Sequence, residues 1–210
     1  MRELILKMSM TLDGFVSDLE GANGWMFGSG PESRAWLTAL LADASLHVMG
    51  SRTFGDMAAW WPTSTDIIAG PMNAIPKAVF SRRGAAALEG LETTVNLREA
   101  MARNGATQSG ELQPGAESWT RAEVASGELA AEIARLKAGE GRPIIAHGGV
   151  RFGQSVAASG LVDRFVLVVH PVALGQGRPL FGNLGQPLAL RLESARAFPS
   201  GVIAQTYRPA

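Results

Sequence analysis

The sequence predicts an α/β fold: a single three-layer domain with a mostly parallel central sheet and an antiparallel C-terminal edge. Short apolar runs alternate with longer amphipathic stretches through the middle of the chain, which is typical of a parallel sheet covered by helices. The run 165–169 is the most apolar and suits a central strand, and 188–192 with 202–207 resemble a closing antiparallel pair. The 210 residues suit one substantial domain, so we expect a single unit over 1–210.

The first half of the chain is expected to alternate strands with helices. Strands are expected at 4–8, 15–17, 46–49 and 78–81. A helix should begin at Pro31, because proline suits the first helical position and Glu32 then lies in the positive first turn. A second helix should run from Thr53 to about Trp61, since Pro62 disfavours helix in the residue before it.

The second half begins with a stretch where the periodic pattern decays. The segment 84–115 is polar and rich in glycine near its end, so we expect a long surface loop or insertion there. A strand at 119–124 should be followed by a helix that Ser126 caps and that continues to Lys137. Another strand and helix are expected at 144–147 and 149–159.

Composition limits the classes of function. Hydrophobic residues make up 46 % of the chain and charged residues 18 %, which supports a packed core rather than disorder. Nineteen basic and nineteen acidic residues cancel, so we expect no general nucleic-acid or membrane surface. Cysteine is absent, and we see neither a signal peptide nor a membrane span, so we expect a cytoplasmic protein. His47, His147 and His170 lack the spacing of a metal site and read as polar residues at strand ends.

Three expected strands are each followed by small, hydroxyl or basic residues. These residues are Gly50, Ser51, Arg52 and Thr53 after the first strand, Ser81, Arg82 and Arg83 after the second, and Gly148 and Gly149 after the third. Glycine lets the backbone approach a ligand closely, free N–H groups at a helix start attract phosphate, and arginine is a bidentate donor. Because open α/β sheets bind ligands at the carboxyl ends of their strands, the three turns together suggest a phosphate-rich nucleotide.

Each turn also has an ordinary structural interpretation. Arg52 could be a solvated residue on a normally capped helix, and Arg82 with Arg83 could form a solvated basic turn. Gly148 and Gly149 could simply make a tight connection, and they do not form the G-x-G-x-x-G pattern of a standard Rossmann fold.

In order along the chain, these turns resemble those of the dihydrofolate reductase-like superfamily. The similarity is closest to the branch typified by the C-terminal reductase domain of the bacterial bifunctional riboflavin-biosynthesis protein. The matching segments are 9–14, 49–54, 79–82, 127–137, 147–149, 160–163, 171–177 and 180–181. They span nearly the whole chain, and no deaminase half precedes them, so we expect the reductase step alone.

The resemblance implies an NADPH-binding domain with the cofactor across the carboxyl ends of the strands. By position, Arg52 and Thr53, beside Gly50 and Ser51, would meet the pyrophosphate. Ser81 and Arg82, helped by Arg83, would meet the 2′-phosphate of the adenosine. Gly148 and Gly149 would let the diphosphate and the nicotinamide ribose approach. The turn formed by Asp13 and Gly14 would border the nicotinamide and the substrate.

The expected reaction is hydride transfer from NADPH to a small heterocyclic or carbonyl substrate, of the riboflavin-pathway or pterin-reductase kind. Asp13 is the first candidate for the general acid and Glu32 the second, although Glu32 is also a conventional first-turn glutamate and a bound water could serve instead. The alternative is a nucleotide-binding protein of the same fold without catalytic activity. A homodimer is plausible, because 171–181 and the late strands offer an apolar edge.

Overall fold

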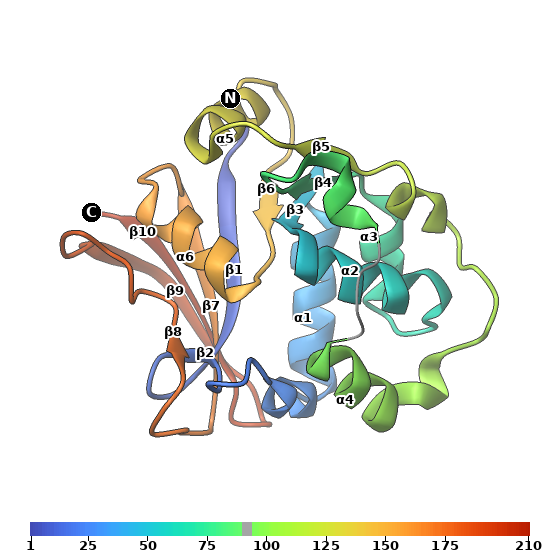
Figure 1. The fold of residues 1–210 in the computed structure, drawn as a ribbon. Coiled ribbons are helices and arrows are strands. Elements are labelled where there is room, and N and C mark those ends of the chain that lie inside the picture. The colour runs from blue at the N-terminus through green and yellow to red at the C-terminus, as the bar shows by residue number, and fades with distance from the viewer. Residues whose placement is uncertain (90–93) are drawn as a thin grey trace.

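The computed structural model describes residues 1–89 and 94–210 and contains one large central sheet (Figure 1). The sheet has eight strands in the order β5 (Glu123–Ala125), β4 (Lys77–Phe80), β3 (Leu46–Gly50), β6 (Ile144–Ala146), β1 (Leu4–Thr11), β7 (Arg164–His170), β10 (Ile203–Pro209) and β9 (Leu190–Ala197). All pairs from β5 to β7 are parallel, whereas β10 runs antiparallel to both β7 and β9. The predicted fold class is therefore confirmed.

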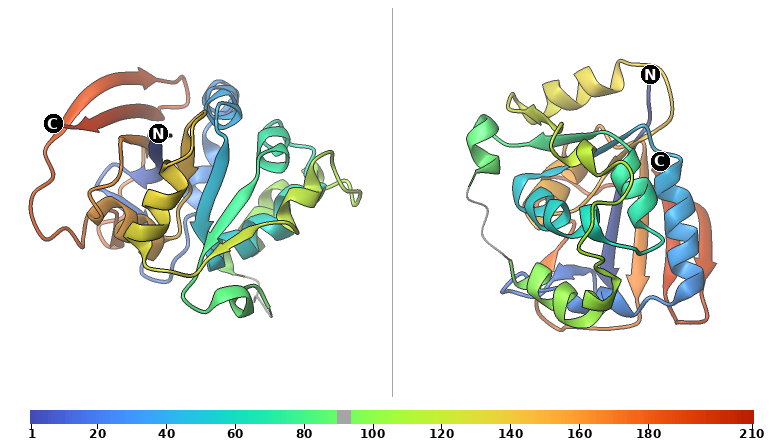
Figure 2. Two further views of the ribbon diagram at one scale, coloured as in Figure 1. Left: turned by 90° about the horizontal axis from the view of Figure 1, so that it is seen from above. Right: turned by 90° about the vertical axis from the view of Figure 1, so that its right-hand side faces the viewer.

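Helices cover both faces of this sheet and make three layers (Figure 2). One face packs against α1 (Pro31–Ala42), α2 (Ser51–Trp60) and α3 (Ala69–Ala74), and the other against α5 (Leu129–Lys137) and α6 (Val150–Ala158). Alternate residues of β1 serve the two layers: Leu4 and Leu6 face α5 and α6, whereas Ile5 faces α1 to α3. Burying each such side chain stabilises the fold by roughly 1.5–3 kcal/mol, which explains why the central strands are nearly continuous apolar runs.

The segment 84–115 contains more regular structure than expected. It holds the 3₁₀ turns η3 (Gly84–Leu88) and η4 (Gly105–Thr107) and the helix α4 (Val95–Asn104). Thr94 caps α4, since its Oγ1 accepts a hydrogen bond from the backbone N–H of Leu97 at 3.2 Å. Leu97 and Ala100 pack on Trp60 of α2. The expectation of a loop is therefore wrong for 95–104, and the part of the segment at 90–93 lies outside the described residues.

Two other local expectations need correction. Ser126 does not cap α5: the helix begins at Leu129 after Glu128, and Glu132 accepts a hydrogen bond from the backbone of Gly127 instead. The expected strand at 119–124 is a 3₁₀ turn, η5 (Ala116–Trp119), followed by the three-residue strand β5. The short strand β2 (Phe15–Ser17) forms as expected, but it pairs with β8 (Arg178–Pro179) in a separate two-stranded sheet.

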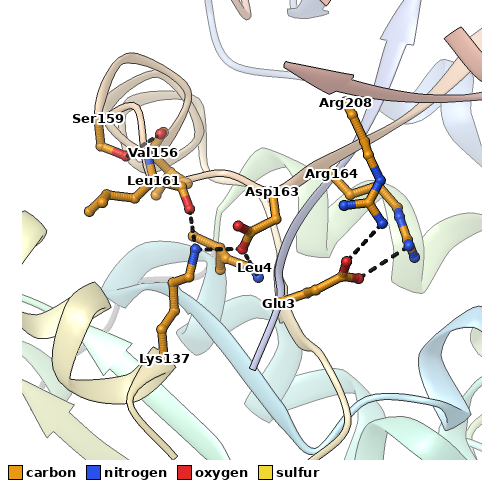
Figure 3. Close-up of polar contacts among 9 residues, drawn as sticks. All are labelled: Glu3, Leu4, Lys137, Val156, Ser159, Leu161, Asp163, Arg164 and Arg208. Carbon is orange, nitrogen blue, oxygen red and sulfur yellow. Dashed lines mark hydrogen bonds and ion pairs between the residues drawn. The ribbon is translucent and has the colours of Figure 1, made fainter. Parts of the chain in front are cut away.

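Charged residues join the amino ends of β1 and β7 to the carboxyl end of β10 (Figure 3). Asp163 accepts a hydrogen bond from the backbone N–H of Leu4 at 2.7 Å and pairs with Lys137 at the end of α5. Glu3 pairs with Arg164 at 3.2 Å and with Arg208 at 2.7 Å, and so links β7 and β10 beside β1. These contacts lie at the amino ends of the parallel strands and leave their carboxyl ends for the candidate site.

Within the described residues, every helix is too short or too polar to cross a membrane.

Candidate functional site

The carboxyl ends of β4, β3, β6, β1 and β7 lie side by side and form the carboxyl edge of the sheet, which is distinct from its edge strands β5 and β9. Gly50 lies opposite Phe80 in the register of β3 and β4, and Val48 lies opposite Ala146 in that of β3 and β6. The turns that follow these strands therefore lie at successive positions along the edge. The structure thus brings together the three groups of candidate cofactor residues that the sequence singled out.

The first turn leads from β3 directly into α2. Gly50 precedes the helix with an extended backbone, and no side chain caps its first N–H groups. The helix begins two residues earlier than predicted: Ser51 and Arg52 occupy its first two positions, and Thr53 is its third residue. Arg52 is exposed on this first turn. Uncapped N–H groups next to a guanidinium group favour an anion.

The second turn leads from β6 into α6. Gly149 precedes α6 with φ +94°, a conformation that favours glycine, and no side chain caps this helix. A Cβ atom on Gly149 would lie 2.7 Å from Oγ1 of Thr53, and one on Gly148 would lie 3.1 Å from Cε of Met8. The two glycines therefore allow the start of α6 to lie against the first turn of α2. Two positive helix ends meet at this point.

The third turn follows β4. The Ser81 backbone N–H donates to Ala125 at 3.0 Å, which continues the pairing with β5. Arg83 is used within the turn: its backbone N–H donates to Ser81 Oγ at 3.2 Å, and its guanidinium group donates to the Ala86 carbonyl at 3.0 Å. Arg82 is exposed, and its guanidinium group makes no hydrogen bond or ion pair within the described part of the chain. Arg82 is thus the more available of the two cations.

Asp13 lies at this edge, but its carboxylate is already used. Thr11 Oγ1 donates to it at 2.6 Å, and the backbone N–H groups of Leu174 and Gly175 donate at 3.0 and 2.8 Å. The hydrogen bond from Thr11, followed by that from Gly175, lowers the pKa of Asp13 below its ordinary value. Asp13 therefore holds the loop after β7 to the turn after β1 as an ionised group, which makes it a weak proton donor.

Glu32 lies farther along this edge, past the carboxyl end of β7. It is exposed in the first turn of α1, beside the tip of the hairpin that joins β9 and β10. Ser200 at that tip donates a hydrogen bond to the carbonyl of Ser29, just before α1, at 2.7 Å. In the sheet order, three strands separate β10 from β3, so the structure does not bring Glu32 together with the turns that carry Arg52 and Arg82.

The structure also reveals a basic group of side chains that the sequence analysis missed. Leu6 of β1 and Val48 of β3 both pair with Ala146 of β6. The next residue of β1, Lys7, therefore lies on a strand next to those of His147 and His47. All three side chains are on the face of the sheet that packs on α1, α2 and α3. Nε2 of His147 lies 2.7 Å from Nδ1 of His47. Lys77 completes the group on β4 and is 2 % exposed, with its Nζ 4.4 Å from the centre of the Trp119 ring.

Burial lowers the pKa of every member of this basic group. Desolvation is the largest cause in each case: the pKa falls to about 8 for Lys7, about 3 for His47 and about 7 for Lys77, and well below its ordinary value for His147. The sequence contained one sign that Lys7 belongs to the covered face of the sheet. Lys7 stands two residues after Ile5 in a strand, at an alternate position that faces the same covered layer.

A hollow lies at the opposite ends of the strands. This depression of about 370 Å³ is lined by Ala42, Ser45, Pro71, Ile75 and Arg142, among others. Ser45 immediately precedes β3, so the depression lies at the amino ends of the strands. We assign no role to it, because the groups with binding chemistry lie at the carboxyl ends.

The fold and this edge define an open α/β domain of the class whose ligands lie outside the carboxyl ends of the strands. The chain belongs to the family of the RibD C-terminal domain, whose model matches residues 2–204. It is 27 % identical over 211 residues to the uncharacterized protein YyaP of Bacillus subtilis, covering 98 % of this chain and 94 % of that protein.

Solved structures share the fold. A protein of Shewanella sp. PV-4 assigned to riboflavin biosynthesis superposes with a TM-score of 0.64 at 21 % identity, over 100 % of this chain and 99 % of that one. The Thermotoga maritima diaminohydroxyphosphoribosylaminopyrimidine deaminase/5-amino-6-(5-phosphoribosylamino)uracil reductase gives a TM-score of 0.64 at 17 % identity. The whole of the present chain covers 57 % of that longer protein.

Proposed function

We propose that this protein is an NADPH-dependent reductase that transfers hydride to a small heterocyclic or carbonyl substrate. The observation that carries the proposal is the meeting of two uncapped helix starts at Gly149 and Thr53. Arg82, which has no partner among residues 1–89 and 94–210, lies two strands away on the same edge. Membership of the RibD C-terminal family supports a reductase of the riboflavin-pathway type. The Thermotoga protein, which is named as a uracil reductase, shares the fold.

The residues at this edge fit the cofactor. Because Gly149 carries no side chain, the starts of α6 and α2 lie close together, so the N–H groups of both helices could face one diphosphate. Arg52 and Thr53 would hold the pyrophosphate, with Gly50 and Ser51 shaping the approach. Arg82 and Ser81 would bind the 2′-phosphate, and Arg83 would contribute mainly by stabilising their turn. The bound cofactor supplies the hydride, and the chain supplies binding, orientation and exclusion of water.

We also propose a homodimer in the cytoplasm. Seven of the eight residues of β9 are exposed, including Leu192, which is 51 % exposed, and the strand forms an edge of the sheet. A second copy pairing along β9 would satisfy its free backbone groups. Light scattering over a range of concentrations should give twice the mass of the chain, and a mass of one chain at all concentrations would overturn the dimer.

The cofactor proposal is tested by titrating the protein with NADPH and NADH, followed by NADPH oxidation in the presence of pterins and pyrimidines. We expect micromolar affinity for NADPH, weaker binding of NADH, and oxidation with at least one heterocycle. Tight NADPH binding without oxidation of any compound would instead support the nucleotide-binding alternative. Failure to bind either nucleotide would overturn both.

A further inference from the structure

A short segment between β2 and α1 lies at the carboxyl ends of β1 and β7. It comprises residues 21–28, here called the strap, and contains the 3₁₀ turn η1 (Gly24–Gly28). The ring of Trp25 contacts that of His170, with 5.1 Å between their centres, and His170 ends β7 opposite Thr11 at the end of β1. Figure 1 shows the strap, in blue, running along the lower edge of the sheet toward α4. The strap thus lies at the two strands that follow the proposed cofactor turns in the sheet order.

The helix α4 holds the strap from its other side. The side chain of Asn96 bonds the strap twice: its Oδ1 accepts a hydrogen bond from the backbone N–H of Asn23 at 3.0 Å, and its Nδ2 donates to the carbonyl of Gly21 at 3.0 Å. Phe27, farther along the strap, packs against the apolar cluster that α4 forms with α2. One polar side chain of α4 therefore fixes the backbone at the start of the strap, and an apolar contact fixes its end.

The helix α4 is itself anchored on α2. Asp56 of α2 accepts a hydrogen bond from Oγ1 of Thr94 at 2.8 Å, and Thr94 caps the start of α4. The first turn of the same helix α2 carries Arg52 and Thr53. Through α4, the helix that is proposed to bind the pyrophosphate is therefore joined to the strap at β1 and β7.

Two polar atoms at the strap favour its release. Nε1 of Trp25 and Oε2 of Glu99 are buried and have no hydrogen-bond partner in the part of the chain that the structure describes. Glu99 Oε2 lies directly against Gly24, which leaves no room there for a Cβ atom. Both atoms would gain water if the strap moved away, and a buried polar group without a partner costs free energy. Gly21 and Gly30, with φ of +95° and +77°, lie at the two ends of the strap and can absorb a change in backbone direction.

Resting on the proposed function, we propose that the strap closes the substrate end of the site and that α4 is the latch that holds it. Substrate enters when the strap leaves α4, and closure then excludes water from the reaction. Asn96 favours the closed position through its two hydrogen bonds, whereas the buried carboxylate oxygen of Glu99 favours the open one. Both are positioning residues that act through the strap.

Hydrogen exchange of the free protein tests the latch without any ligand. Asn96→Ala removes both hydrogen bonds to the strap, so the amides of residues 22–28 should exchange at least about tenfold faster, the scale of one or two lost hydrogen bonds, while those of β1 keep their rates. Glu99→Gln replaces the unpartnered carboxylate with a neutral group that is easier to bury, so the same amides should exchange more slowly. Arg103→Ala, in the exposed last turn of α4, is the control and should leave the strap unchanged.

The opposite signs expected for the two variants distinguish a latch from a general weakening of the fold. Faster exchange of the strap in both variants, or an unchanged rate in Asn96→Ala, overturns the latch. If Asn96→Ala loses α4 altogether, Glu99→Gln still decides the question, because an unchanged or faster rate in that variant overturns the proposal.

The closing of the substrate end is tested with two ligands in the wild type. NADPH should slow the exchange of the strap, whereas adenosine 2′,5′-bisphosphate, which has no nicotinamide to reach β1 and β7, should leave it unchanged. Equal slowing by both ligands, or an unchanged strap at saturating NADPH, overturns the closing of the substrate end and leaves the cofactor proposal standing. Failure to bind NADPH overturns the proposed function, whereas the latch is still decided by exchange in the free protein.

Discussion

Gly149 and Thr53 approach so closely that a Cβ atom on Gly149 would lie 2.7 Å from the Thr53 Oγ1. Gly149→Ala should therefore push the start of α6 away from α2, and it also places alanine at φ +94°. We expect a loss of about 1–3 kcal/mol in the free energy of unfolding and a fall of at least tenfold in NADPH affinity. Urea denaturation and a fluorescence titration measure the two effects.

Gly160→Ala is the matched control for this substitution. Gly160 also has a positive φ, +70°, but a Cβ atom there would meet nothing within 4 Å. The control should lose stability through backbone strain alone and keep its NADPH affinity. Equal losses of affinity in the two variants would contradict a close approach of the cofactor at Gly149.

Arg82→Ala tests the proposed 2′-phosphate contact. Removing a charged hydrogen bond of this kind costs about 1.5–3 kcal/mol, so NADPH should bind roughly 10–100 times more weakly while NADH binding changes little. Arg121→Ala is the control, because Arg121 is also exposed but precedes β5, at the opposite edge of the sheet. An equal loss of affinity for both nucleotides in Arg82→Ala would refute the assignment.

Asp13→Asn should reveal the structural use of this carboxylate through its pH dependence. Hydrogen bonds keep the folded-state pKa of Asp13 below 3.8, so its stabilising contribution is complete above that pH and is lost as the pH falls through the lower, folded-state value. The variant should therefore melt at a lower temperature than the wild type at neutral pH, and the gap should close in acid. Asp43→Asn, at the exposed end of α1, is the control. A gap that does not change with pH would mean that the charge of Asp13 is not responsible.

Leu97→Ala tests whether α4 is part of the packed structure. Leu97 is 7 % exposed against Trp60, so truncation should cost about 2–3 kcal/mol in urea denaturation. Met101→Ala on the same helix removes a side chain that is 40 % exposed and should cost much less. Similar small losses from both would indicate that α4 contributes little to the fold.

The parts of the fold that could be predicted from the sequence are those with strong local signals. The apolar run 165–169 lies in β7 because a parallel strand covered on both faces is apolar at nearly every position. Pro31 marks the start of α1 for an equally local reason. By contrast, α4 buries only Leu97 and Ala100, and its packing partner Trp60 is far away in the sequence, so its pattern alone was too weak.

The same distinction applies to the candidate site. The turns with Arg52, Arg82 and Gly149 could be found because each directly follows its own strand. The pair of His47 and His147 could not, since the two residues are 100 positions apart and meet only through the register of β3 and β6. Their separation in the sequence does not predict that they are in contact, and only the sheet order makes them neighbours.

The hairpin of β9 and β10 has a consequence for how the molecule opens. Seven of the eight residues of β9 are exposed, and Glu193 ties the hairpin to Arg164 of β7 by an ion pair of 3.3 Å that salt would weaken. Figure 2 shows this hairpin projecting from the body of the domain. Its amides should therefore exchange with solvent through a local opening, well before those shared by β1 and β7, which become accessible only on global unfolding. An opening confined to β9 would leave β10 paired with β7 from Ile203 to Tyr207, so it would not disturb the strands that carry the site.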